Sequence, residues 1–117
     1  KVLTNLQGKF NAYSYRIPTS IVSSADATIK VQNDINLEKL LDLFNQYEKK
    51  NPKIIHNNHD ALVSTDFIKT DYSVAVDHRF THVKNNYIKL MTWYDNEWGY
   101  SSRVVDLVNY LGSSIDC

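Results

Sequence analysis

Cysteine, glycine and proline are scarce in this chain of 117 residues. The one cysteine, Cys117, is the last residue, so no internal disulfide can form and a cytoplasmic location is the default expectation. A terminal thiol is more typical of a chance residue than of a nucleophile, because no neighbouring group is held in place to activate it. Glycine occurs only at positions 8, 99 and 112, so the chain contains neither a Gly-rich dinucleotide fingerprint nor a phosphate-binding P-loop.

The chain also lacks a net charge and a long apolar run. Thirteen basic and thirteen acidic residues cancel, which disfavours nucleic acid and anionic membranes as partners. No stretch approaches the ~18 apolar residues of a membrane-spanning helix, and residues 1–9 do not resemble a secretory signal. The missing initiator Met indicates a processing point or a fragment boundary. Hydrophobic residues make up 43% and charged residues 22%, which is typical of one globular domain.

Two segments have the periodicity of helices. Residues 37–49 carry apolar side chains at helical spacing, with Asn36 as the N-cap and Pro52 beyond the end. A terminal helix follows the last strand, with Gly112 as its predicted C-cap. Its apolar face is predicted to consist of Val104, Leu107, Val108 and Leu111.

The remaining apolar runs are rich in β-branched and aromatic residues, which favours strands. The predicted strands are residues 10–17, 27–31, 54–55, 62–65, 72–80 and 87–94, with a turn at 84–86. The order is therefore strands, a helix, several strands and a helix. This order predicts an α+β fold, in which a mixed or mainly antiparallel sheet is covered by helices on one face.

The four histidines raise the question of a metal site. His56 and His59 are separated by two residues, and His78 and His82 by three. His78 and His82 lie in or beside a predicted strand, where residues i and i+4 are ~13 Å apart and too far from each other to share one ion. His56 and His59 lie in a predicted polar loop, where solvated histidine is the usual case. The sequence therefore favours no metal site.

Arg16 is a candidate anion-binding residue. It ends an aromatic run and stands immediately before Pro18, with the hydroxyl of Thr19 close by. A guanidinium held by a stiff proline turn can receive a phosphate oxygen through its fork of donors. The alternative is a surface arginine that lies over the neighbouring tyrosines, and the residues alone favour this alternative.

Asn96 is the second candidate, in a junction of aromatic and polar residues between the last strand and the last helix. A carboxamide both donates and accepts, so it can pair with another amide such as a nicotinamide side group. The alternative is helix capping, by Asp95 or by Asn96 itself. The neighbouring aromatic residues, among them Tyr100, are more typical of core and interface packing than of cofactor stacking.

Four motifs, in order and at matching spacing, resemble phosphorylating glyceraldehyde-3-phosphate dehydrogenase. Residues 1–9 are similar to its K-V-x-P-x-L-x-G-K, with Thr4 where proline is usual, and residues 16–19 to its R-V-P-T. Residues 63–67 match V-S-x-D-F, and residues 93–107 match W-Y-D-N-E-x-G-Y-S-x-R-V-V-D-L. The chain thus resembles the latter part of that family's catalytic domain, over residues 1–112 with a tail at 113–117.

The resemblance implies roles for three residues. Arg16 would contact the substrate phosphate or inorganic phosphate, Asn96 would hydrogen-bond the carboxamide of NAD, and Tyr100 would line the nicotinamide pocket. The family's nucleophilic cysteine and basic histidine lie upstream, as does its amino-terminal NAD-binding domain, and none of these is expected in this chain. We therefore expect no catalytic residue here, no oxidation of an aldehyde phosphate and no firm binding of NAD by the chain alone, and a homo-oligomer for the complete enzyme.

Several alternatives remain open at this point. His78 and Arg79 follow Asp77 where the family usually has a small residue, which questions the subtype. Erythrose-4-phosphate dehydrogenase is a close relative, but it usually has Cys and Phe at the positions of Tyr94 and Tyr100. A non-catalytic oligomerisation or interaction module is a different class of function, and a truncated gene product without function is a third reading.

Overall fold

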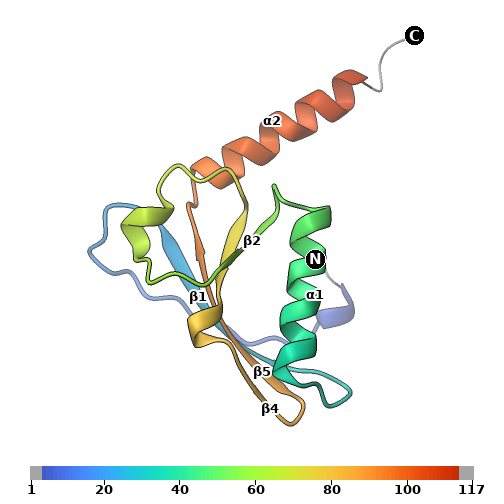
Figure 1. Cartoon of the computed structure of the whole chain (residues 1–117). Coiled ribbons are helices and arrows are strands. Elements are labelled where there is room, and N and C mark those ends of the chain that lie inside the picture. Colours follow the sequence, from blue (N-terminus) through green and yellow to red (C-terminus); the bar gives the residue numbers. More distant parts are fainter. Residues whose placement is uncertain (1–3, 114–117) are drawn as a thin grey trace.

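The structure is a computed structural model that describes residues 4–113. A short 3₁₀ turn, η1 (Thr4–Leu6), is followed by an extended segment that leads to the sheet (Figure 1). The predicted start of the first family motif, residues 1–3, and residues 114–117 with Cys117 lie outside the described residues. The remaining elements are β1 (Ser23–Lys30), α1 (Leu37–Lys50), β2 (Ile55–Asn58), η2 (Ser64–Phe67), β3 (Val74–Asp77), η3 (His78–Phe80), β4 (His82–Lys84), β5 (Tyr87–Tyr94) and α2 (Trp98–Ser113).

The sheet is built around β5. β1 pairs with β5 in antiparallel register, from Ser23 opposite Tyr94 to Lys30 opposite Tyr87. β3 pairs with β5 in antiparallel register, β2 extends the sheet by parallel pairing with β3, and β4 forms a hairpin with β5. The sheet is therefore mixed, which confirms the predicted α+β class.

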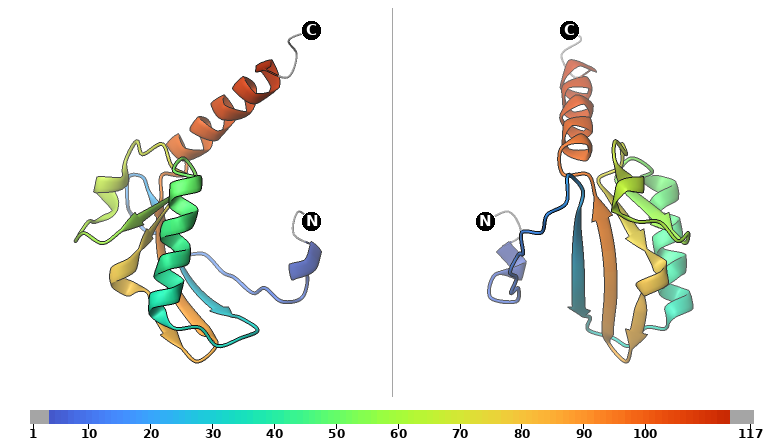
Figure 2. Two further views of the ribbon diagram at one scale, coloured as in Figure 1. Left: turned by 45° about the vertical axis from the view of Figure 1, so that its right-hand side comes forward. Right: turned by 90° about the vertical axis from the view of Figure 1, so that its left-hand side faces the viewer.

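Apolar side chains are buried on both faces of this sheet because neighbouring residues of a strand point to opposite sides. On one face, Val76 packs with Leu40 of α1 and with apolar residues of β2 and β5. On the other face, Ala75 packs with Phe67 of η2 and with Val22. The helix α1 thus covers one face, and the segment around η2 covers part of the other (Figure 2).

The two helices are placed differently. α1 begins at the predicted cap, because the Asn36 side chain accepts a hydrogen bond from the Lys39 N–H at 2.8 Å. It ends at Lys50, within one residue of the prediction. α2 starts beside the sheet and extends away from it (Figure 1). Gly112 lies inside α2, so its prediction as the C-cap was wrong. Within residues 4–113, neither helix is long and apolar enough to cross a membrane.

The strand predicted at residues 10–17 was wrong. This segment is extended but pairs with no strand among the described residues, and its aromatic side chains are solvent-exposed. Phe10, Tyr13 and Tyr15 are 78%, 81% and 82% exposed. Alternation of aromatic residues indicates a surface suited to burial, and a strand forms only where a neighbouring backbone accepts its hydrogen bonds.

Other strand boundaries also differ from the predictions. Residues 62–65 do not form a strand, because the Asp66 carboxylate accepts the Val63 N–H at 2.8 Å and closes η2. The run 72–80 is a strand only over Val74–Asp77, because Asp77 then accepts the Arg79 N–H and starts η3. β1 begins four residues earlier than predicted, and β2 runs beyond Ile55 to Asn58.

Candidate functional site

The junction between β5 and α2 is closed by the side chain of Asp95. This carboxylate is 2% exposed. Its Oδ1 accepts the N–H groups of Glu97 at 3.0 Å and Trp98 at 2.8 Å, and its Oδ2 accepts the Lys69 N–H at 2.9 Å. Burial raises the pKa of Asp95, but the three backbone hydrogen bonds outweigh it, so the pKa lies below its ordinary value.

Asp95 therefore fills the capping role that sequence reasoning divided between two residues. It satisfies free N–H groups at the start of α2. Asn96 is exposed, and its side chain has no hydrogen-bond partner within residues 4–113. The carboxamide of Asn96 is thus free to bind a ligand, on a junction that is fixed by its neighbour.

The first turn of α2 is held against the loop that precedes β3. A Cβ on Gly99 would lie 3.0 Å from the carbonyl oxygen of Tyr72, so the close approach of helix and loop requires glycine. The Trp98 indole donates to Asp71 Oδ1 at 2.7 Å. Tyr100 lies in the same turn and is 71% exposed. The support beneath Asn96 and Tyr100 is therefore rigid, while both side chains face solvent.

Arg16 lies on the exposed segment that precedes β1, where it forms no hydrogen bond or ion pair with another described residue. The segment is anchored by Val22, which is buried against Phe67 and Ala75. Val22 has a φ of 73°, which is strained for a β-branched residue. The anchor therefore fixes where this segment enters the sheet.

The pairing of β1 with β5 brings the two candidate regions to one end of the sheet. Ser23, the first residue of β1, lies opposite Tyr94, the last residue of β5. The segment with Arg16 thus enters the sheet next to the junction with Asn96, as Figure 2 shows at the base of α2. No hydrogen bond or ring contact joins Arg16 to Asn96 or Tyr100 among the described residues.

Comparison with known proteins decides the family. Residues 1–96 match the family model described as the C-terminal domain of glyceraldehyde 3-phosphate dehydrogenase. The chain belongs to this family.

Full-length relatives are consistent with this assignment. Over 97% of the chain, it is 39% identical to glyceraldehyde-3-phosphate dehydrogenase of Atriplex nummularia and 38% identical to the cytosolic enzyme of Pinus sylvestris. It is 36% identical to glyceraldehyde-3-phosphate dehydrogenase 2 of Staphylococcus aureus (strain MRSA252). These names do not favour the erythrose-4-phosphate alternative. The chain spans about one third of the length of these relatives, 32% to 34%.

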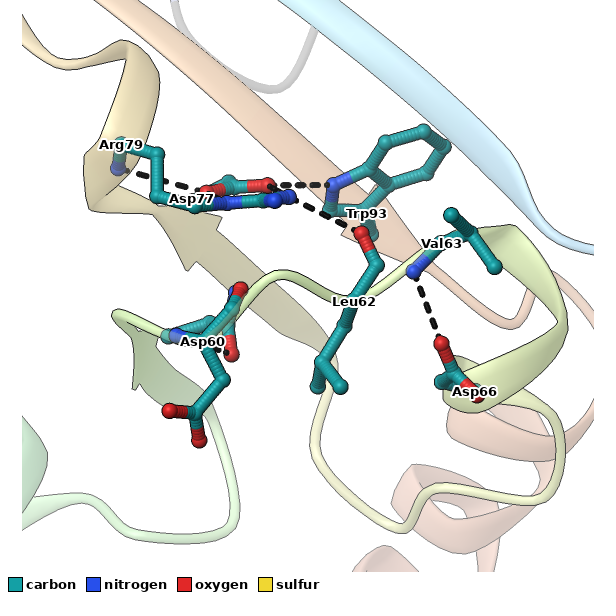
Figure 3. Close-up of polar contacts among 8 residues, drawn as sticks. Asp60, Leu62, Val63, Asp66, Asp77, Arg79 and Trp93 are labelled. Atoms are coloured by element: carbon teal, nitrogen blue, oxygen red, sulfur yellow. Dashed lines mark hydrogen bonds and ion pairs between the residues drawn. The ribbon is translucent and has the colours of Figure 1, made fainter.

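One polar network, at the buried end of β3, was missed by sequence reasoning. Asp77 is fully buried, and its carboxylate accepts Nε of Arg79 at 2.8 Å, Nη2 of Arg79 at 2.6 Å and the Trp93 indole at 3.1 Å (Figure 3). Arg79 also donates to the Leu62 carbonyl at 2.9 Å. Burial raises the pKa of Asp77, but the bonds from Arg79 and Trp93 outweigh it and lower the pKa. The network holds the loop before η2 against β3 and β5, which is a structural role.

Three of the four histidines, His56, His59 and His78, belong to a second network, which does not follow the spacing pairs considered above. The His78 ring stacks on the His59 ring with centroids 4.9 Å apart. Asn57 donates to Glu48 at 2.7 Å, so its Oδ1 faces His78 Nε2 at 2.9 Å and the neutral ring carries its proton there. His56 pairs with Glu48 at 2.9 Å. Among residues 4–113, no group of three or more His, Cys, Asp or Glu side chains could hold a metal ion.

The residues of this second network lie far apart in the sequence, on α1, on β2 and after β3. Spacing along one segment therefore carried no signal for it. Lys69, whose N–H reaches Asp95 from a backbone φ of 60°, was missed for the same reason.

Proposed function

We propose that this chain is the nicotinamide- and phosphate-positioning part of an NAD-dependent glyceraldehyde-3-phosphate dehydrogenase. One observation carries the proposal: Asp95 caps α2, so the exposed carboxamide of Asn96 has no structural role of its own among the described residues. A free amide on a rigid junction is suited to bind the carboxamide of nicotinamide. Tyr100, one turn into α2, would line the same pocket, and Arg16 would bind the phosphate of the aldehyde substrate or inorganic phosphate.

The remaining chemistry would be supplied by the part of the enzyme that these residues do not include. In the reaction proposed for the complete enzyme, a cysteine thiolate would add to the aldehyde carbon to give a thiohemiacetal, and transfer of its hydride to NAD would leave a thioester. Phosphate would then attack the acyl carbon, so that the acyl phosphate forms and the cysteine thiolate leaves. We expect the residues of this chain to supply neither the nucleophile nor its base. The chain alone is therefore expected to form no NADH. The Pinus sylvestris relative is named as cytosolic, and we propose the same compartment for the complete protein.

A chimeric enzyme tests this proposal. The chain would replace the matching C-terminal third of the Atriplex nummularia relative, and NADH formation would be followed with aldehyde phosphate, NAD and phosphate. We expect phosphate-dependent activity from the chimera and none from the chain alone. A soluble, folded chimera without activity would contradict the proposal, as would NADH formation by the chain alone.

Single substitutions in the chimera would test the individual residues. Asn96→Ala should lower kcat/KM for NAD about 10-fold, as expected for one lost hydrogen bond, with exposed Asn33→Ala as the control. Arg16→Ala should weaken use of phosphate by about 10- to 100-fold. Arg16→Lys, which keeps the charge but loses the fork of donors, should fall between Arg16→Ala and the unchanged chimera.

A non-catalytic interaction module is the second candidate, and the apolar face of α2 favours it. Val105, Leu107 and Val108 are each more than half exposed. Such a face is typical of a surface that another protein covers. Sedimentation of the chain would separate the two candidates, because a compact monomer without affinity for the enzyme's other part would argue against an interaction module.

A further inference from the structure

We propose that Asp95 is the positioning residue for Asn96, through a bond that ties the junction to the turn at Lys69. The inference rests on the proposed function, because it assumes that Asn96 binds nicotinamide. It goes beyond that function by assigning a role to a buried residue that would not touch the cofactor. Three backbone N–H groups, from two segments of the chain, converge on this one carboxylate.

The bond to Lys69 is more than a helix cap. A cap needs only the bonds to Glu97 and Trp98, which are local. The bond to Lys69 reaches a residue 26 positions earlier in the chain. Lys69 has a φ of 60°, a conformation unfavourable for a residue with a side chain. Its N–H bond to a buried carboxylate offsets that strain, so the turn and the junction stabilise each other.

The backbone turn at Lys69 is itself attached to the hydrophobic core. Thr70 Oγ1 donates to the Phe67 carbonyl at 2.8 Å, and Phe67 is fully buried. The Phe67 ring stacks on Trp93 of β5 at a centroid distance of 5.8 Å. Asp95 thus links the junction that carries Asn96 to the core around Phe67, and β5 links the same junction to that core through Trp93. The backbone on both sides of Asn96 is held, although the Asn96 side chain itself makes no hydrogen bond to a described residue.

Other contacts hold α2 but do not close this turn. The Trp98–Asp71 bond and the close approach of Gly99 to Tyr72 hold residues of α2 itself, which come after Asn96 in the chain. A carboxylate suits the role because all three of its partners donate. Asparagine at position 95 would place an NH₂ group against an N–H, and serine would keep a cap but would be too short to reach Lys69 as well.

A double-mutant cycle in the chimeric enzyme tests the proposal. The variants are Asp95→Asn, Asp95→Ser, Asn96→Ala and each Asp95 variant combined with Asn96→Ala. We expect either Asp95 variant to lower kcat/KM for NAD by up to about 10-fold, the loss expected for Asn96→Ala, because a misplaced binding group can lose no more than the group itself contributes. An Asp95 variant combined with Asn96→Ala should have nearly the same kcat/KM for NAD as Asn96→Ala alone, because Asp95 acts through Asn96. Asp66→Ala, which removes another carboxylate bond to a backbone N–H (Figure 3), should leave NAD use unchanged.

A coenzyme analogue gives a readout that general destabilisation would not move. In 3-acetylpyridine adenine dinucleotide, an acetyl group replaces the carboxamide and cannot donate N–H to Asn96. The unchanged chimera should prefer NAD, and Asp95→Ser should lose the preference while its helix cap and fold remain. If Asp95→Ser keeps the full preference, or if its effect adds to that of Asn96→Ala, the positioning role is overturned.

The two proposals fail in distinguishable ways. If Asn96→Ala leaves NAD use and the preference unchanged, the proposed role of Asn96 is wrong. If Asn96→Ala has its expected effect but Asp95→Ser has none, only the positioning role is wrong. In the 117-residue chain, hydrogen exchange adds a test without cofactor: the Lys69 amide should exchange about 10-fold faster in Asp95→Ser. An unchanged exchange rate would overturn the bond on which the proposal stands.

Discussion

Helices α1 and α2 are both amphipathic, yet only α1 buries its apolar face within the described structure. Leu40 of α1 is 7% exposed and packs with the apolar residues of the sheet. Leu107 of α2 is 56% exposed, and α2 extends beyond the sheet (Figure 1). The comparison shows that helical periodicity predicts which face is apolar but not what covers that face.

The ends of the two helices differ in the same way. α1 is capped by Asn36 at its start, and Glu48 near its end binds the Asn57 N–H and side chain. α2 is held at its start by Asp95 and by the approach of Gly99 to Tyr72, and as far as its middle by the Lys53–Asp106 ion pair at 2.8 Å. One helix belongs to the core, and the other is a rigid extension from the candidate site. The following predictions test this difference, from the largest expected effect to the smallest.

The largest effect is expected at Leu40. Leu40→Ala removes a buried side chain between α1 and the sheet and should lower the free energy of unfolding by about 2–5 kcal/mol. Urea unfolding followed by circular dichroism would measure the loss. A change below about 0.5 kcal/mol, the size usual for surface substitutions, would mean that α1 does not cover the sheet as described.

Gly99→Ala should have the next largest effect. Alanine favours a helix over glycine by about 1 kcal/mol, but here its Cβ would lie 3.0 Å from the Tyr72 carbonyl oxygen. Overpacking should dominate, and the free energy of unfolding should fall by about 1–3 kcal/mol. Gly112→Ala is the matched control, because its Cβ would have no neighbour within 4 Å. It should leave the protein as stable or more stable, and equal effects at both glycines would contradict the close contact.

These two helices also show how far the sequence could predict the structure. Local signals sufficed for α1, because Asn36 and the apolar spacing lie within one segment. The strand at residues 10–17 was predicted wrongly because pairing depends on a distant backbone. Asn96 was recognised as a candidate from its motif, but the sequence left the capping role open between Asp95 and Asn96, which are adjacent. The bond from the Lys69 N–H to Asp95 could not be predicted, because Lys69 is remote in the sequence. The Asp77–Arg79–Trp93 network was missed for the same reason.

Lowering the pH should loosen the attachment of α1 by a smaller amount. Burial first, and then the neighbouring His59, lower the pKa of His78 below 6.5, although Asp77 and Glu48 act in the opposite direction. The unfolded chain therefore binds this proton more readily than the folded chain. Stability from neutral His78 is complete above pH 6.5 and is lost as the pH falls through 6.5 toward the folded-state pKa.

Urea midpoints at neutral and mildly acidic pH would measure this dependence. His78→Gln should reduce the drop in stability between the two pH values, whereas the exposed His82 provides the control substitution, His82→Gln. At lower pH, Glu48 should add a loss of the same sign. Burial raises the pKa of Glu48, but the bonds from Asn57 and His56 lower it below 4.5, so its contribution fades as the carboxylate is protonated. An identical pH dependence in His78→Gln would contradict this account.

The smallest effect in the isolated chain is expected at Leu107. Leu107→Ala makes the same chemical change as Leu40→Ala, but it should alter the free energy of unfolding by less than about 0.5 kcal/mol, because Leu107 is already exposed. In the chimera, the same substitution should lower stability by about 2 kcal/mol or more if the rest of the enzyme covers α2. Thermal unfolding of both proteins, with and without the substitution, would measure the difference. If Leu107→Ala has equally small effects in both proteins, the rest of the enzyme does not cover Leu107. The apolar face of α2 would then no longer support an interaction surface.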